Sequence, residues 1–193
     1  VGHDEAGPPL VHLVRLSPYV AAPLEPVDDE LLATVRAGFD SVGQALAQQR
    51  FRGGIGEVMR IVGEANAYVS KTEPFKLKAD DQRERLGTVL HVLAQAVSDL
   101  NTMTAPFLPH GANRIHQIMG GTGEFVPMPE LREVDDLDGG PGYPVIMGDY
   151  GTTPQWESRP VVPGTPIGPP TPVFTKFDPS VVDDEIARMR GDG

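Results

Sequence analysis

The stretch EANAYVSKTEPFKL, Glu64–Leu77, contains the end of a helix and the corner that follows it. Proline cannot continue a helix, because it lacks an N–H donor and its ring clashes with the preceding turn. The residue before it, Glu73, is also pushed out of helical geometry. The chain therefore turns at Pro74 and presents Phe75 beside Lys76. An aromatic ring next to a cation is a platform on which a nucleic-acid base can stack; the alternative is that Phe75 plugs the core.

Apolar residues recur at three- and four-residue spacing on both sides of this corner, which predicts amphipathic helices. The expected helices cover residues 29–49, about 52–71, about 80–105, about 110–119 and, at the end of the chain, 178–190. The predicted core seam of the third helix consists of Leu86, Leu90, Leu93, Val97 and Leu100. Because the first four helices are joined by short loops, we expect antiparallel neighbours in an all-α helix bundle.

Acidic residues and glycines mark the predicted helix starts. Residues 28–29, both aspartates, are expected to cap the first helix, and Asp80 or Asp81 the third, because such side chains satisfy free N–H groups and complement the helix dipole. Three glycines within residues 53–56 do not form a phosphate-binding loop, since no strand precedes them and their spacing is wrong. We expect them to permit close approach of another helix.

Proline and glycine divide the chain into three predicted parts. Residues 1–27 form an N-terminal arm, residues 28–121 the helical bundle, and residues 122–193 a long Pro/Gly-rich tail that holds most of the 20 prolines. Isolated apolar residues occur along the tail, among them the single tryptophan, Trp156. They favour a tail that wraps back on the bundle and ends in a short helix.

The charge balance limits what the chain can bind by itself. The formal net charge is −11, whereas a nucleic-acid-binding domain usually carries a basic footprint. Any RNA contact must therefore come from a local patch. One basic cluster surrounds the corner and consists of Lys71, Lys76, Lys78, Arg83 and Arg85. Contact with phosphate is the functional interpretation, and an ordinary solvated helix start is the alternative.

The residue types also exclude several kinds of chemistry. The chain has no cysteine, which excludes disulfides and cysteine-based zinc sites and favours a cytoplasmic protein. No apolar run approaches the roughly 20 residues that a membrane span needs. His110, Asn113 and His116 recur at three-residue spacings, but we expect no metal there, because no clustered carboxylate accompanies them. Instead, His110 is predicted to cap its helix, and His110, Asn113 and Arg114 are candidate interface residues.

Four stretches carry a resemblance to a known family. They are RFRGGIGEVMRIVGEANAYVSKTEPFKL (50–77), LGTVLHVLAQAVSDLNTMTAPFLPHGANRIHQIMGG (86–121), DDLDGGPGYPVI (135–146) and PPTPVFTKFDPSVVDDEIARM (169–189). In order and spacing they resemble the C-terminal, all-helical anticodon-binding domain of methionyl-tRNA synthetases, most closely the actinobacterial type. The resemblance implies a domain that follows a Rossmann-type catalytic domain and holds the methionine anticodon.

The chain departs from this family at several places. It has no His-x-Gly-His and no Lys-Met-Ser-Lys-Ser signature, so the resemblance implies that ATP binds to a catalytic domain or partner and not to this chain. The family's anticodon-reading tryptophan corresponds to Phe75, which keeps a stacking face but loses the indole N–H. Ser70 stands at a position that is often acidic in relatives, and residues 9–16 lack the family's Asn-Arg pair.

The resemblance therefore implies a tRNA-docking domain or subunit of a methionyl-tRNA synthetase-like ligase, which is not catalytic alone and works with a catalytic partner. The candidate tRNA-binding residues are Asn66, Ser70, Pro74, Phe75, Lys76, Lys78 and Arg83. The alternative is the scaffold domain of a degenerate synthetase-like ligase in specialised metabolism, such as a cupin-associated enzyme that forms an N–N bond without binding tRNA. The missing Asn-Arg pair and the acidic charge favour this alternative, and a purely structural interaction module is a third hypothesis.

Overall fold

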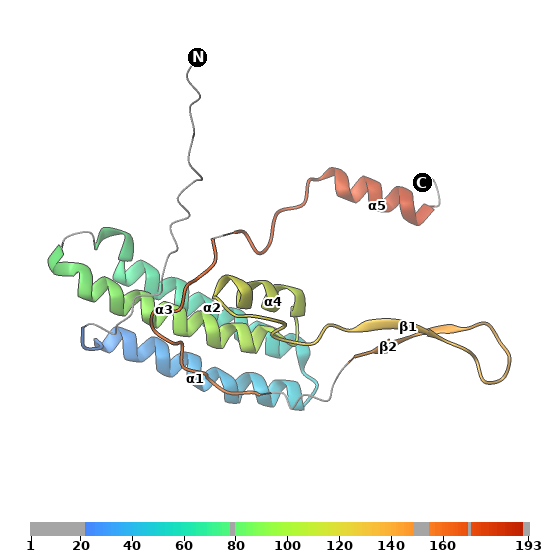
Figure 1. The fold of residues 1–193 in the computed structure, drawn as a ribbon, viewed down its shortest axis with the longest axis horizontal. Coiled ribbons are helices and arrows are strands. Elements are labelled where there is room, and N and C mark those ends of the chain that lie inside the picture. The colour runs from blue at the N-terminus through green and yellow to red at the C-terminus, as the bar shows by residue number, and fades with distance from the viewer. Residues whose placement is uncertain (1–21, 78–79, 149–154, 170, 191–193) are drawn as a thin grey trace, which may run out of the picture.

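Three long helices of 22 residues each form the body of the molecule. The computed structural model describes residues 22–77, 80–148, 155–169 and 171–190. The helices of the body are α1 (Pro26–Ala47), α2 (Phe51–Thr72), α3 (Arg83–Thr104) and the shorter α4 (Pro109–Ile118). The long helices pack against one another with short connections, and α4 packs on α3 (Figure 1). The predicted helix bundle is confirmed, and the expected N-terminal arm lies almost wholly outside the described residues.

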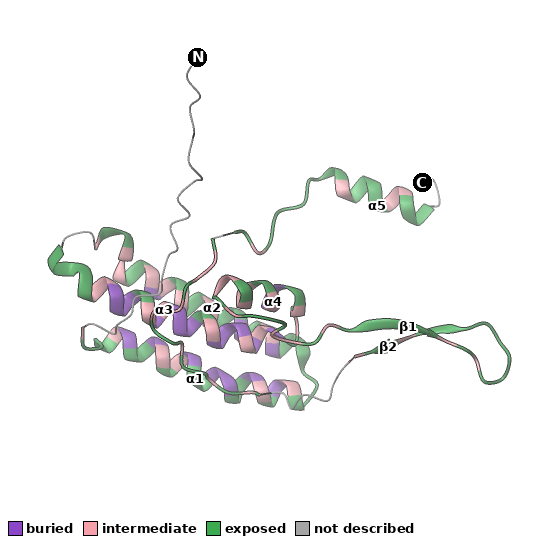
Figure 2. Cartoon of the chain, in the orientation of Figure 1, coloured by how far each residue is buried: buried purple, intermediate pink, exposed green. Residues whose placement is uncertain are grey.

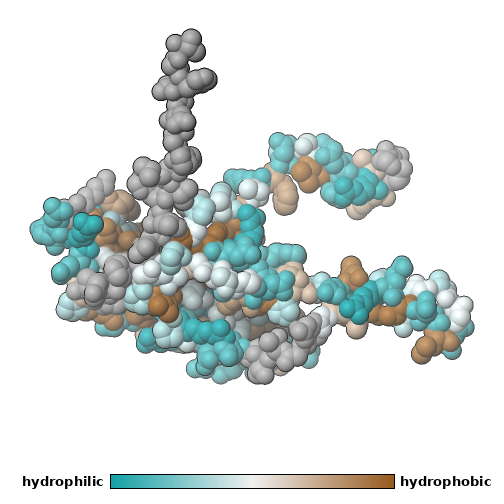
Figure 3. All heavy atoms as spheres, viewed as in Figure 1, coloured by the Kyte–Doolittle hydropathy of each residue, from teal (hydrophilic) through white to brown (hydrophobic). Residues whose placement is uncertain are grey.

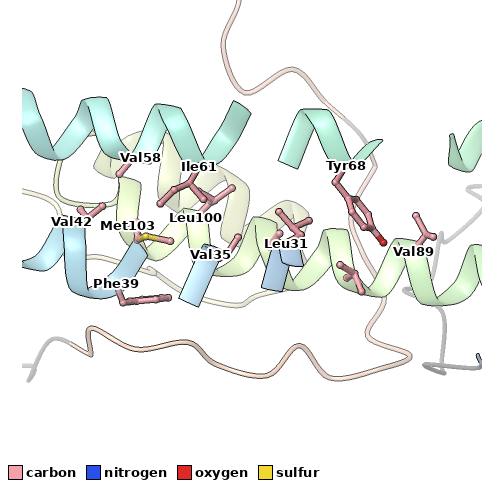
Figure 4. Close-up of a cluster of buried hydrophobic side chains, with 12 residues drawn as sticks. Leu31, Val35, Phe39, Val42, Val58, Ile61, Tyr68, Val89, Leu100 and Met103 are labelled. Carbon is pink, nitrogen blue, oxygen red and sulfur yellow. The ribbon is translucent and has the colours of Figure 1, made fainter. Parts of the chain in front are cut away.

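The hydrophobic core lies where α1, α2 and α3 face one another. Figure 2 shows the buried residues on these facing sides, and Figure 4 shows the side chains that meet there. The largest fully buried apolar side chains are Ile61, Met103, Val35, Val42, Val58, Val89 and Val92. Gly38 brings α1 close to this cluster, because a Cβ atom at that position would lie 2.5 Å from the Cδ1 atom of Ile61.

The buried face of α3 differs from the predicted seam. Leu100 is buried as expected, but Leu90 and Val97 are 42% and 39% exposed. The core instead takes the neighbouring row, which includes Val89 and Val92, both completely buried. The physical reason is the space between the helices. Where helices approach closely, the smaller side chains of valine and alanine fit the interface, whereas Leu90 and Val97 lie at its border.

The helix starts also differ in detail from the predictions. Glu25 is the N-cap of α1, and the backbone N–H of Glu25 donates to the Asp28 carboxylate at 2.8 Å, so Asp28 stands in the first turn of the helix. Asp80 and Asp81 lie in a 3-10 turn before α3, whose N-cap is Gln82. The prediction that His110 caps α4 is wrong, because the N-cap is Leu108 and His110 lies inside the first turn.

The glycines at the start of α2 serve close packing at one position only. A Cβ atom at Gly54 would lie 3.1 Å from the Phe107 ring and 3.6 Å from the Ala45 side chain. At Gly53 only the Arg50 side chain lies near, and at Gly56 nothing lies within 4 Å. The expectation of close helix approach is therefore confirmed for Gly54.

The tail contains a β-hairpin that the sequence pattern did not predict. Strand β1 (Glu130–Val134) pairs antiparallel with β2 (Tyr143–Met147), and Leu131 lies opposite Ile146. A glycine-rich segment, residues 139–142, lies in the turn that joins the two strands. The hairpin projects from the body, as does the last helix, α5 (Ser180–Arg190) (Figure 1). Both carry exposed hydrophobic residues, seen as brown patches in Figure 3.

The middle of the tail does wrap back on the body. We call residues 155–168 the tail strap. The Trp156 Nε1–H donates to the backbone carbonyl of Phe39 at 2.8 Å, and the two rings meet edge to face, 5.7 Å apart. Gln95 on α3 donates to the carbonyl of Arg159 and accepts from the N–H of Val161, both at 2.9 Å. The predicted wrapping is confirmed for this stretch.

Candidate nucleic-acid interface

The corner, residues 73–77, has a defined backbone. Glu73 ends α2 in the left-handed conformation, with φ +42°, and its N–H still donates to the carbonyl of Val69. Helices commonly end at a residue in the left-handed conformation, and proline often follows because it cannot continue the helix. Pro74–Lys76 then form one 3-10 turn, closed by a bond from the Leu77 N–H to the Pro74 carbonyl at 3.3 Å. The predicted turn at Pro74 is confirmed.

Phe75 faces solvent at this corner. It is 60% exposed, which excludes the alternative that it plugs the core. Leu77, two residues on, packs against the core and supplies the apolar contact that attaches the corner to the body. An aromatic side chain exposed on a short, attached turn is therefore available for stacking.

The basic residues near Phe75 are held only loosely. Lys76 pairs with Glu73 at 2.7 Å and Lys71 with Glu30 at 3.9 Å, in both cases between largely exposed side chains. Such pairs are worth at most about 1 kcal/mol, so a phosphate can replace them at small cost. Arg83 is exposed at the start of α3. Lys78 lies outside the described residues.

Arg85 does not belong to this patch, contrary to the prediction from its position in the sequence. Its guanidinium is only 18% exposed and makes two bonds to the Asp28 carboxylate, from Nη1 at 2.5 Å and from Nη2 at 2.9 Å. A guanidinium in a bidentate ion pair cannot turn outward without leaving the buried carboxylate of Asp28 without its ion-pair partner. The patch available for phosphate is therefore smaller than expected.

Asn66 and Ser70 lie on the exposed side of α2, one helical turn apart, on the way to the corner. The Ser70 hydroxyl donates to the backbone carbonyl of Asn66 at 3.1 Å. This bond uses the hydroxyl proton and leaves its oxygen free to accept. Both side chains are exposed to solvent, and their role in RNA binding stays a prediction.

A buried polar cluster, which the sequence pattern did not reveal, joins the last turns of α2 to the first turn of α3. We call Asp28, Tyr68 and Arg85 the Asp28 cluster. Asp28 is completely buried and accepts a bond from the Tyr68 hydroxyl at 2.6 Å. Burial favours a raised pKa for Asp28, but the bonds from Arg85, Tyr68 and the Glu25 N–H outweigh it and hold the pKa of this carboxyl below its usual value. Burial and the adjacent carboxylate raise the pKa of Tyr68.

The candidate interface residues of α4 mostly hold the chain's own tail. Asn113 accepts bonds from the N–H groups of Phe125 and Val126, at 2.6 and 3.1 Å. Arg114 donates to the carbonyls of Pro172 and Val173, both at 3.2 Å. Their interface therefore lies within the chain. His110 is exposed on α4, and its contact with a partner stays a prediction.

No group of histidines and carboxylates suited to a metal occurs among the residues that the structure describes. His116, which the spacing had placed with His110, stacks on Phe125 with the rings 5.2 Å apart. Within the described part of the chain, no helix is both long and apolar enough to cross a membrane.

Comparison with known proteins gives these features a context, although no family model matches the chain. A methionine–tRNA ligase from Salinispora tropica is 53% identical over 91% of this chain, and one from Nocardioides sp. is 54% identical over 88%. The chain's sequence is related to the C-terminal region of methionine–tRNA ligases. The resemblance drawn from the motifs is thereby confirmed. The chain spans less than a third of these ligases, 29% and 28% of their lengths.

Solved structures agree on the fold. The free-state crystal structure of Mycobacterium tuberculosis methionyl-tRNA synthetase superposes with a TM-score of 0.62, covering 86% of this chain and 28% of that enzyme. The same enzyme bound to methionyl-adenylate superposes with a TM-score of 0.60. Sequence identity in both cases is 21%, so these matches support the arrangement of helices alone. The similarity to the methionine–tRNA ligases thus rests on the sequence matches, and the fold is consistent with it.

Proposed function

We propose that this chain is the tRNA-docking part of a methionyl-tRNA synthetase-like ligase. One observation carries the proposal: Phe75 stands 60% exposed on a short turn, beside Lys76, in a chain closely similar to methionine–tRNA ligases. In this arrangement Phe75 stacks on a base of the anticodon, where the family has tryptophan. Base stacking on an aromatic side chain is worth about 1–3 kcal/mol.

Charged and polar neighbours of Phe75 would complete the contact. Lys76, Lys78 and Arg83 would meet phosphates, and Asn66 and Ser70 would line the groove beside the ring. Because a chain with net charge −11 repels RNA at long range, we expect modest affinity for this part alone. Affinity should fall with added salt, with a slope of about −0.7 per phosphate neutralised for a single strand.

The ligation chemistry belongs to another part of the assembly. The chain has neither of the ATP-handling signatures of class I synthetases, so ATP would bind to a catalytic domain or partner subunit. The role of this chain would then be to hold the tRNA while its acceptor end reacts elsewhere. This division is supported by the match, which covers less than a third of each similar ligase.

Exchanging Phe75 for alanine tests the proposal, and Phe51→Ala is its matched control. Phe51 is 58% exposed, but it lies at the other end of α2. With a methionine-tRNA anticodon stem-loop, we expect Phe75→Ala to weaken binding about tenfold or more, by loss of about 1–3 kcal/mol of stacking. Phe51→Ala should bind like the parent chain. Equal affinities for all three proteins, measured by fluorescence anisotropy, would contradict the proposal.

Measurements with tRNA also distinguish tRNA docking from the second hypothesis, a scaffold domain. A scaffold domain of a degenerate ligase is favoured by the acidic charge and by phenylalanine in place of tryptophan. In that case the chain and its catalytic partner would ligate their substrates with ATP at a rate that tRNA does not change. Binding that depends on the anticodon sequence supports tRNA docking instead.

A further inference from the structure

The two chain segments that flank the corner are joined through one buried carboxylate. Tyr68 lies in the last turns of α2, five residues before Glu73, and Arg85 lies in the first turn of α3. Both bind Asp28 of α1. The end of one helix and the start of the next are thus fixed to the same point on a third helix.

Every acceptor position of this carboxylate is used. Oδ1 accepts from the Tyr68 hydroxyl at 2.6 Å and from Arg85 Nη2 at 2.9 Å; Oδ2 accepts from Arg85 Nη1 at 2.5 Å and from the Glu25 N–H at 2.8 Å. An ionised carboxylate offers about four such positions. Because all four are filled by donors from three helices or helix caps, the side chains have one arrangement that satisfies them.

The Phe75 ring, by contrast, is mostly exposed and has few contacts of its own that could fix its direction. The ring is 60% exposed, and the corner attaches to the core through Leu77. Its neighbours Glu73 and Lys76 pair with each other on the surface. Phe75 lies seven residues after Tyr68 and ten residues before Arg85, so the direction of its ring depends on where these two residues are held, and both bind Asp28.

We propose that Asp28 is a positioning residue for the Phe75 corner, acting through Tyr68 and Arg85. Buried ion pairs contribute little net stability compared with apolar side chains of similar size, and one role that they can serve is to select a unique geometry. Here the geometry selected is the relation between the end of α2 and the start of α3. Only the RNA part of the test below rests on the proposed function.

Two measurements without RNA test the positioning itself in the full chain. In Asp28→Asn, we expect hydrogen exchange of the two hydrogen-bonded amides of the turn, those of Lys76 and Leu77, to become at least fivefold faster at temperatures where the helices stay intact. The 19F signal of 4-fluorophenylalanine at position 75 should shift, and Phe75→Tyr assigns that signal. The matched control is Glu57→Gln, which breaks an exposed bidentate pair between Glu57 and Arg60 on α2 and should change neither quantity.

A double-mutant cycle with RNA tests whether the effect passes through Phe75. Asp28→Asn should weaken binding of the anticodon stem-loop about fivefold in the parent chain, and should have almost no effect once Phe75 is alanine. An equal loss in both backgrounds would overturn the proposal, because the effect would then not pass through the ring. A merely structural role lowers stability without this coupling.

Further outcomes are also decisive. If no variant and no parent chain binds RNA, the proposed function fails, while hydrogen exchange and the 19F signal still decide the positioning role. If Asp28→Asn does not fold, Tyr68→Phe replaces it, since this change keeps the buried ring and removes one bond to Asp28. Unchanged exchange and an unchanged 19F signal in a folded variant overturn the proposal.

Discussion

Asp28 and Asp99 are both almost completely buried, at 0% and 2% exposure, but they hold different regions in different ways. Asp28 lies in the first turn of α1 and faces the guanidinium of Arg85. Asp99 lies under the tail strap and accepts bonds from the Ser158 hydroxyl at 2.9 Å and from the Gln95 amide at 3.1 Å. Among the described residues Asp99 forms no ion pair, and the positive charge of Arg36 acts on it from farther away and favours a lower pKa.

This difference gives the two carboxyls opposite shifts in pKa. Burial raises the pKa of Asp99, and its hydrogen bonds only partly oppose that effect. For Asp28, the combined bonds from Arg85, Tyr68 and a backbone N–H lower the pKa despite burial. The helical body is thus joined at the corner by a charged group that prefers to be ionised, whereas the strap is attached through one that burial favours in its neutral form.

The largest expected effect is at the corner. Asp28→Asn should lower the free energy of unfolding by about 3 kcal/mol, because it removes the buried carboxylate that binds Arg85 and leaves that guanidinium only the exposed Glu25 carboxylate, 3.3 Å away. Urea unfolding at pH 7, followed by circular dichroism, measures the loss. Glu57→Gln is the control and should cost less than about 1 kcal/mol, since its pair with Arg60 is exposed. Similar losses for the two variants would contradict the charged-cluster account.

The strap should respond next. Trp156→Ala removes a half-buried indole and its bond to the Phe39 carbonyl, so we expect a loss of about 2 kcal/mol. Hydrogen exchange should accelerate at residues 155–161 and stay slow in the core of α2. Trp156→Phe keeps most of the contact and should recover part of the loss. Faster exchange throughout the body would show that the strap and the body unfold as one unit.

The contributions of Asp28 and Asp99 to the free energy of unfolding should depend on pH in opposite directions. The pKa of Asp28 is lower in the folded chain, so its contribution to stability is present at neutral pH and is lost as the pH falls through that lowered value. The pKa of Asp99 is raised, so its contribution is full below its unfolded value near 3.8 and is lost as the pH rises through the folded value. At pH 7 the Asp99 contribution has therefore been lost, so Asp99→Asn should cost less stability than Asp28→Asn does at the same pH. Unfolding curves between pH 3 and 7 check both signs, and parallel curves for the two variants would be the contrary result.

The smallest effect is expected in the hairpin. Ile146 is 69% exposed, whereas Ile61 in α2 is completely buried. Ile146→Ala should change the unfolding free energy by less than about 0.5 kcal/mol, while the same substitution at Ile61 should cost about 2–5 kcal/mol. Comparison of the two variants by thermal unfolding shows how far the hairpin is independent of the body.

Helix positions and the corner could be predicted from the sequence, because apolar spacing and proline act locally. The apolar spacing of α2 and the break at Pro74 place both elements within a few residues of the observed bounds. The buried row of α3 could not be predicted, since a choice between Val89 and Leu90 depends on how closely the neighbouring helices approach.

The candidate site was predicted in part for the same reason. The turn at Pro74 follows from local sequence, but whether Phe75 is exposed or buried in the core stayed open until the structure showed it 60% exposed. The burial of Arg85 depends on Asp28, which is 57 residues away in the sequence. A pattern of neighbouring charges cannot reveal such a partner. The hairpin was missed because its strands are short and Pro144 interrupts β2, which weakens any strand signal.

The packing of Trp156 on α1 also has a consequence for how the chain folds. Its bond to the Phe39 carbonyl joins residues 117 positions apart, and contacts of such long sequence separation slow folding. Ribosomal synthesis delivers α1 first and the tail last, so the body can assemble while the strap is still absent. Packing of the tail strap on the body should then occur in a late and separate kinetic phase. The fluorescence of this single tryptophan would report that phase without any added label.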